Sequence, residues 1–122
     1  MSNTIHTNTS YIKSVCEKAL TIIASYESGT IGIVDASRVL AATCHELGLS
    51  RKEPFITFIA VESDTHHLPG SDQRVLWSQR GLAKVDMEIS ELEGHYRDEM
   101  IAAGSALCEQ IKQFKLEDHV DA

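Results

Sequence analysis

The sequence is poor in the residues that mark several common protein classes. Its 122 residues include two prolines, three cysteines, three phenylalanines, three tyrosines and one tryptophan. Few aromatic residues mean a mostly aliphatic core, and an odd, widely spaced set of cysteines does not form a disulfide framework. Cys16, Cys44 and Cys108 each fall on or beside the apolar stripe of a predicted helix. This placement is typical of buried thiols in a reducing compartment.

Signals for export and for membrane insertion are also missing. The first ten residues are polar and lack a charged segment followed by an apolar run, which excludes a secretory signal. No apolar stretch approaches the roughly 20 residues needed to cross a bilayer. With 43% apolar and 24% charged residues, the composition is that of an ordinary globular protein. We expect one cytoplasmic domain over residues 1–122, with residues 1–9 and 117–122 frayed, and no membrane partner.

Recognised catalytic and cofactor motifs are absent. There is no HExxH, no paired CxxC, no twelve-residue calcium loop and no glycine-rich phosphate loop. His45 and Glu46 begin a metalloprotease-like pattern, but Leu49 stands where the second histidine is required. We therefore expect no cofactor and no enzymatic activity.

Helical periodicity is what the sequence does contain. Between Ile12 and Tyr26, apolar residues recur at spacings of three and four, with Thr9 or Ser10 as the N-cap and Gly29 as the stop. A second helix is predicted from Ile33 to Leu47 by the same pattern. The two helices predict the first half of a helical bundle.

The segment 54–62 fits two kinds of element. Pro54 suits the first turn of a helix, whereas Ile56, Thr57, Ile59 and Val61 are β-branched and suit a strand. We favour the helix, because no second strand is available to satisfy the backbone of the first. Residues 64–74 then read as a loop, and Trp77 is expected to plug the core where the loop ends.

The longest predicted element begins at Ser78. Its ten apolar residues fall within a sector about 100° wide: Leu82, Val85, Ile89, Leu92, Tyr96, Met100, Ala103, Leu107, Ile111 and Phe114. At about 1.5 Å per residue, a helix of this length exceeds a compact domain, so it overhangs or bends, at Gly94 or Gly104. The fold class is all-α, a bundle of four to five helices with a long amphipathic C-terminal helix.

Negative charge is concentrated in this last element. Residues 84–122 contain ten Asp or Glu and four Lys or Arg, whereas residues 1–83 contain eight and seven. Helical projection puts five carboxylates on one side of the apolar stripe, Glu88, Glu91, Asp98, Glu99 and Glu109, and Arg97, Lys112 and Lys115 on the other. Such a ridge is either a solvated helix face or a docking surface for a basic protein. It disfavours nucleic acid as a partner.

The segment 62–69 is the densest polar stretch outside that ridge. Asp64 with His66 or His67, and His95 from the long helix, offers a metal site of no established spacing. A histidine oriented by Glu62 or Asp64 offers acid–base chemistry. Alternatively, the polar residues cap the end of an element while Leu68 and Pro69 cover the core.

The residues from Phe58 to Trp77 carry a resemblance, namely Ala60, Val61, Glu62, Ser63, Asp64 and Thr65, then His67, Leu68 and Pro69, and later Arg74 and Trp77. This stretch looks like small bacterial helical proteins of unassigned function. In size and acidity the chain is similar in type to the cytosolic immunity proteins of contact-dependent growth inhibition. The resemblance implies a protein that binds a toxin domain and blocks its active site.

The expected function is therefore an immunity or inhibitor protein that occludes a cationic partner, such as the C-terminal nuclease domain of a toxin. Its expected binding residues are the five carboxylates of the ridge together with Asp64, His66 and His67. We expect a monomer or weak dimer. The alternatives are a structural or regulatory domain that self-associates, and a small metal-binding enzyme built on the loop from Glu62 to His67.

Overall fold

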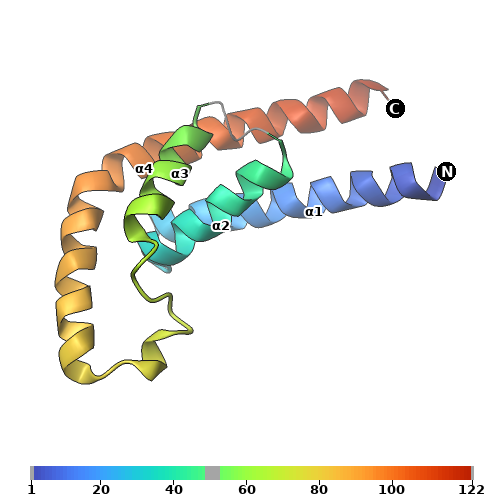
Figure 1. Ribbon diagram of the computed structural model, residues 1–122. Helices are drawn as coiled ribbons and strands as arrows, with labels where there is room; N and C mark the ends of the chain where they lie inside the picture. Colours follow the sequence, from blue (N-terminus) through green and yellow to red (C-terminus); the bar gives the residue numbers. More distant parts are fainter. Residues whose placement is uncertain (1, 49–52, 122) are drawn as a thin grey trace.

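The computed structural model describes the backbone of residues 2–48 and 53–121, and the side chains of residues 10–48 and 53–113 (Figure 1). Over this part of the chain it has four α-helices and one short 3-10 helix and contains no strand. These are α1 (Ser2–Glu27), α2 (Ile33–Glu46), α3 (Phe55–Thr65), η1 (Arg74–Leu76) and α4 (Gln79–Asp121). The prediction of an all-α bundle with a long C-terminal helix is confirmed.

The first helix begins earlier than the sequence pattern indicated. We expected an N-cap at Thr9 or Ser10, but α1 starts at Ser2, because the polar residues before Thr9 include no glycine or proline to stop it. Gly29 (φ 81°) and Gly48 (φ 70°) follow α1 and α2 in the left-handed conformation, which glycine adopts without a Cβ penalty. The expected fraying of residues 1–9 and 117–122 stays a prediction.

Segment 54–62 is helical, so the strand alternative is wrong. Pro54 is the N-cap and α3 runs from Phe55 to Thr65. Its buried residues Phe55, Phe58, Val61 and Thr65 recur at spacings of three and four, which puts them on one helical face. The predicted loop therefore starts after Thr65 rather than at Asp64.

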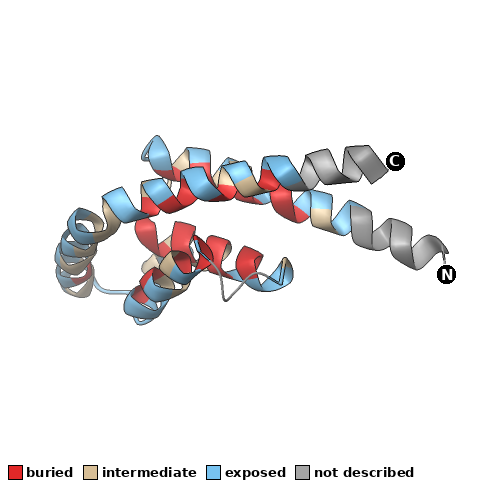
Figure 2. Ribbon diagram, turned by 90° about the horizontal axis from the view of Figure 1, so that it is seen from above, coloured by how far each residue is buried: buried red, intermediate tan, exposed pale blue. Residues whose placement is uncertain are grey.

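All four α-helices contribute to one apolar cluster (Figure 2). From α4 the buried members are Val85, Met100, Ala103, Leu107 and Ile111, whereas Leu82, Ile89, Leu92 and Tyr96 are half-buried. The predicted stripe is thus confirmed over its described side chains, and Phe114 lies outside them. The single domain over residues 1–122 stays a prediction.

The long helix bends. Figure 1 shows the yellow-to-orange part and the red part of α4 running in different directions, with the turn in the orange part of the ribbon. We call residues 79–93 the first limb and the part of α4 after Gly94 the second limb. Gly104 has a different role, because a Cβ there would lie 3.0 Å from Cγ2 of Ile23 in α1.

Trp77 does not plug the core. Its side chain is 43% exposed, and Val75 and Leu76 before it are 83% and 84% exposed. The core at this end is closed instead by Leu68, which is 3% exposed, so the turn that precedes α4 is left outside. None of the described helices carries an apolar stretch long enough to cross a membrane.

Candidate partner-binding surface

The loop after α3 is held by two side chains of α2. The guanidinium of Arg38 donates from Nη2 to the carbonyl oxygens of Leu68 and His66, the latter at 3.2 Å. The carboxylate of Asp35 accepts the backbone N–H of Ser71 at 3.2 Å. Because bonds to charged groups are about twice as strong as neutral ones, α2 fixes the course of this loop.

Gly70 allows the loop to approach α2 this closely. A Cβ at this position would lie 2.9 Å from both Nη1 of Arg38 and Oδ1 of Asp35, a separation that real Cβ atoms do not tolerate without a shift of their neighbours. Sequence reasoning missed Arg38 and Asp35. Their partners lie about 30 residues further along the chain, and no local spacing signals a contact of that range.

Three polar contacts then connect α3 and the region after it to α4. Nε2 of His67 lies 2.5 Å from Oε2 of Glu88, and Nη1 of Arg74 lies 2.8 Å from Oδ1 of Asp86. The hydroxyl of Tyr96 donates to the carboxylate of Asp64, and this hydrogen bond raises the pKa of the Tyr96 phenol. Exposed pairs of this kind contribute little to stability. Their effect is to position both limbs of α4 beside α3 and the loop that follows it.

Two of the five carboxylates of the predicted acidic ridge are engaged in ion pairs. Glu88 is paired with His67, and Oε1 of Glu109 lies 3.5 Å from Nζ of Lys112. Glu91, Asp98 and Glu99 are exposed and make no ion pair with any residue whose side chain is described. We call these three residues the acidic triplet. The bend of α4 separates Glu109 from Glu88 and Glu91, and Lys115 lies outside the described side chains.

The histidines whose side chains are described do not assemble a metal site. Nδ1 of His66 lies 3.0 Å from Oε1 of Glu62 one turn earlier, and the ring of His95 packs edge-on against Tyr96 with centroids 4.6 Å apart. Over the described residues, no group of three or more His, Cys, Asp or Glu side chains is placed to hold a metal ion. Asp64, His66 and His67 are all exposed and rim the same side of the molecule as Glu88.

The polar residues at the end of α3 act in part as the structural interpretation predicted. Thr65 is buried, but its hydroxyl donates to the carbonyl oxygen of Val61 at 2.9 Å, so it does not cap backbone amides as that interpretation had it. Leu68 and Pro69 are buried and cover the core. Asp64, in contrast, accepts a hydrogen bond from Tyr96 and does not cap backbone amides in the described structure.

The cysteines follow the sequence prediction. Cys16 and Cys44 are buried and Cys108 is half-buried. Burial raises the pKa of the Cys44 thiol to about 12, and its Sγ donates to the carbonyl oxygen of Leu40. A thiol that stays protonated at neutral pH is a poor nucleophile, so Cys44 belongs to the core.

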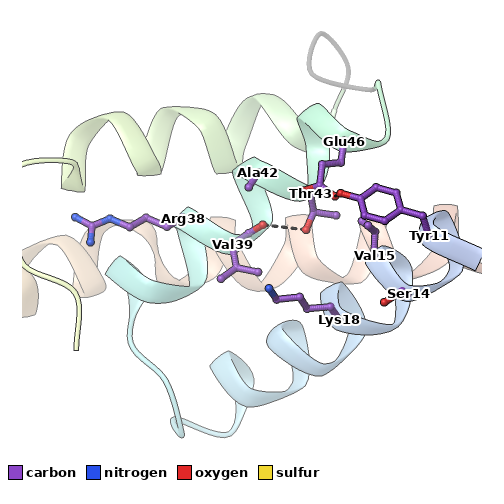
Figure 3. A pocket seen from close by; sticks show the side chains of 9 residues that line it. All are labelled: Tyr11, Ser14, Val15, Lys18, Arg38, Val39, Ala42, Thr43 and Glu46. Atoms are coloured by element: carbon purple, nitrogen blue, oxygen red, sulfur yellow. Dashed lines mark hydrogen bonds between the residues drawn. The ribbon is translucent and has the colours of Figure 1, made fainter. Parts of the chain in front are cut away.

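Two hollows flank Arg38. The first, of about 410 Å³, lies between α1 and α2 (Figure 3), with Lys18 on one wall and, at its far end, a hydrogen bond of 2.6 Å from Tyr11 to Glu46. Arg38 extends away from that end of the groove in Figure 3. It also lines the second hollow, of about 560 Å³, together with His67 and Trp77. Both hollows are open, and polar and apolar side chains line each of them.

Comparison of the chain with protein-family models, with curated proteins and with solved structures found no match.

Proposed function

We propose that this protein is an inhibitor of the immunity type, which binds a cationic protein domain, such as the nuclease domain of a toxin, and blocks access to its active site. The observation that carries the proposal is the acidic triplet. Glu91, Asp98 and Glu99 are exposed and have no ion-pair partner among the described residues, whereas the other described carboxylates of α4 are paired.

The spacing of the triplet suits a protein surface. Asp98 and Glu99 follow Glu91 by seven and eight residues, beyond the bend of α4, so the three residues lie at most about 12 Å apart along the helix. Glu88 and Asp64 add negative charge beside them. A field of one sign over this distance attracts a basic surface, raises the association rate and makes it dependent on salt.

A binding role assigns no chemical step to the histidines. His66 and His67 contact Glu62 and Glu88, and over the described structure their rings hydrogen-bond to no serine or cysteine. Under the proposal they form the rim of the docking surface, where charges tune recognition more than affinity.

The test is a comparison of two variants with equal change in charge. The first is Glu91→Gln, Asp98→Asn, Glu99→Gln, and the control is Glu17→Gln, Asp72→Asn, Glu27→Gln, whose residues are exposed and unpaired within the described structure. The probe is the C-terminal domain of the protein encoded immediately upstream, in a catalytically inactive form, and association rates are measured at low and high salt.

The proposal predicts that the triplet variant associates about tenfold or more slowly at low salt, with a weaker salt dependence, while the control changes by less than about twofold. Co-expression with the active domain should then protect cells only with the wild-type or control protein. Equal association rates for the two variants would contradict a role for the triplet, and absence of binding at low salt would contradict the inhibitor function itself.

A further inference from the structure

The outer face of the first limb is a second unpartnered surface. Arg80, Lys84, Met87 and Glu91 follow one another at spacings of four, three and four, so they fall within a sector of about 60° on the side away from the apolar stripe. All four are exposed, and Met87 is 69% exposed. None of the three charged side chains forms an ion pair with a described residue.

The charges along this face are arranged so that two antiparallel copies of the face match each other. Two cations precede Met87 and a carboxylate follows it. If a second identical limb is laid against the first in the opposite direction, with the two-fold axis near Met87, the basic end of each meets the acidic end of the other. Lys84 and Glu91 lie at equal distances on either side of that axis, about 5 Å along the helix.

We propose that two copies of this chain pair through this face, with their first limbs antiparallel, Met87 at the centre, and Lys84 of each copy against Glu91 of the other. Two-fold pairing uses the same patch on both copies, as most homodimers do. Each ion pair is therefore made twice.

The two cations of this face, Arg80 and Lys84, form no ion pair with a described residue of their own copy. Arg80 and Lys84 are one turn apart, where like charges repel. The carboxylate of Glu88, one turn after Lys84, is the natural intrahelical partner but is held 2.5 Å from His67. A carboxylate from a second copy supplies the ion-pair partner that Lys84 does not find among the described residues of its own copy.

The ends of the face also fit this arrangement. Val75, Leu76 and Trp77 lie immediately before the basic end and expose apolar side chains. At the acidic end, a Cβ at Gly94 would have no heavy atom within 4 Å, so space is open there. Antiparallel pairing brings the apolar turn of one copy toward this open end of the other.

Dimerisation goes beyond the inhibitor function and shares one residue with it. Glu91 belongs to both surfaces, so a cationic partner and a second copy compete for it. Lys84, Arg80 and Met87 belong only to the outer face, whereas Asp98 and Glu99 stay available to a partner.

The first test is a charge-reversal cycle measured by analytical ultracentrifugation of the full chain from about 10 µM to about 1 mM at low salt. The wild type should show a reversible dimer, and Lys84→Glu or Glu91→Lys alone should weaken it at least tenfold. The combination of Lys84→Glu with Glu91→Lys should restore the dimer to within about threefold. Lys18→Glu, an exposed reversal on α1, is the matched control and should leave association unchanged.

The second test is geometric. Two-fold symmetry near Met87 places this residue close to Met87 of the second copy. Met87→Cys should therefore form an intermolecular disulfide under mild oxidation. The rate should be at least tenfold higher than for Ala102→Cys, an exposed position on the second limb. The unsubstituted chain, with its three native thiols, gives the background rate.

A wild type that is monomeric at about 1 mM, a double reversal that does not recover association, or equal cross-linking at the two positions would each overturn the dimer. Neither test uses a toxin domain. Their failure is therefore distinct from failure of the inhibitor function.

Discussion

A Cβ atom added at Gly104 would lie 3.0 Å from Cγ2 of Ile23 in α1, so a methyl group there requires the Ile23 side chain to shift by a few tenths of an ångström. Gly94, ten residues earlier in the same helix, is exposed and has no heavy atom within 4 Å of the same position. Gly94 and Gly104 therefore have opposite roles in α4.

Alanine at these two positions should change stability in opposite directions. Gly104→Ala should lower the free energy of unfolding by about 1–3 kcal/mol, because the added methyl group overpacks a well-filled contact. Gly94→Ala should raise it by about 0.5–1 kcal/mol, because alanine is the better helix former and nothing obstructs it. Urea unfolding followed by circular dichroism measures both. A destabilised Gly94→Ala variant would show that glycine itself is needed for the bend of α4.

Replacement of Arg38 should loosen the loop that follows α3. Arg38→Ala removes the donors to the carbonyl oxygens of Leu68 and His66, and bonds to a charged group contribute about 1.5–3 kcal/mol. We expect a loss of that size in unfolding free energy and faster tryptic cleavage at Arg74, the nearest site. Arg38→Lys should recover little, since an ammonium group does not reproduce the planar fork of donors.

Arg80→Ala is the control for this loop prediction. Arg80 is exposed and forms no ion pair with a described residue, so its loss should change stability by less than about 0.5 kcal/mol. Equal effects of the two arginine substitutions would mean that the contacts of Arg38 do not hold the loop.

Alkaline pH should destabilise the fold through Tyr26. Burial, and then the nearby carboxylate of Glu93, raise the pKa of its phenol from 10.0 to about 12. Between these values the unfolded chain releases the proton and the folded chain keeps it, so the stabilisation present below pH 10 is lost as pH rises towards 12. The loss from this group is on the order of 2 kcal/mol.

The alkaline loss is measured by urea unfolding at a series of pH values. Tyr26→Phe should make the decline in unfolding free energy less steep without abolishing it. The buried thiol of Cys44, whose pKa is raised from 9.0 to about 12, also destabilises the fold over an overlapping range of alkaline pH. An unchanged slope in Tyr26→Phe would contradict the assignment to Tyr26.

Much of the helical architecture was predictable because its signals are local. Spacings of three and four located α2 and the apolar face of α4, and Gly29 and Gly48 ended α1 and α2 where a left-handed residue was needed. The start of α1 was misplaced, because Thr9 and Ser10 are competent caps but nothing in residues 2–8 obliges a helix to stop. Capping residues permit a helix start and do not impose one.

The surface was predicted less well, because exposure depends on contacts between distant segments. The ridge was predicted from the projection of a straight helix, which does not show the bend. The projection also does not show the ion pairs of His67 with Glu88 and of Lys112 with Glu109. Trp77 was assigned to the core on its size alone, whereas Leu68 already closes that end. Arg38 was overlooked, although it holds the loop that carries His66 and His67.

The exposed position of Trp77 also gives the protein an intrinsic optical reporter. It is the sole tryptophan in the chain and stands on the wall of a hollow, beside the turn where α4 begins. Its emission and its accessibility to a soluble quencher will therefore respond to any molecule that covers this end of the fold, while events around the Gly104 crossing leave it unaffected. Contacts at this end of the fold can thus be followed in the unmodified protein, without a label.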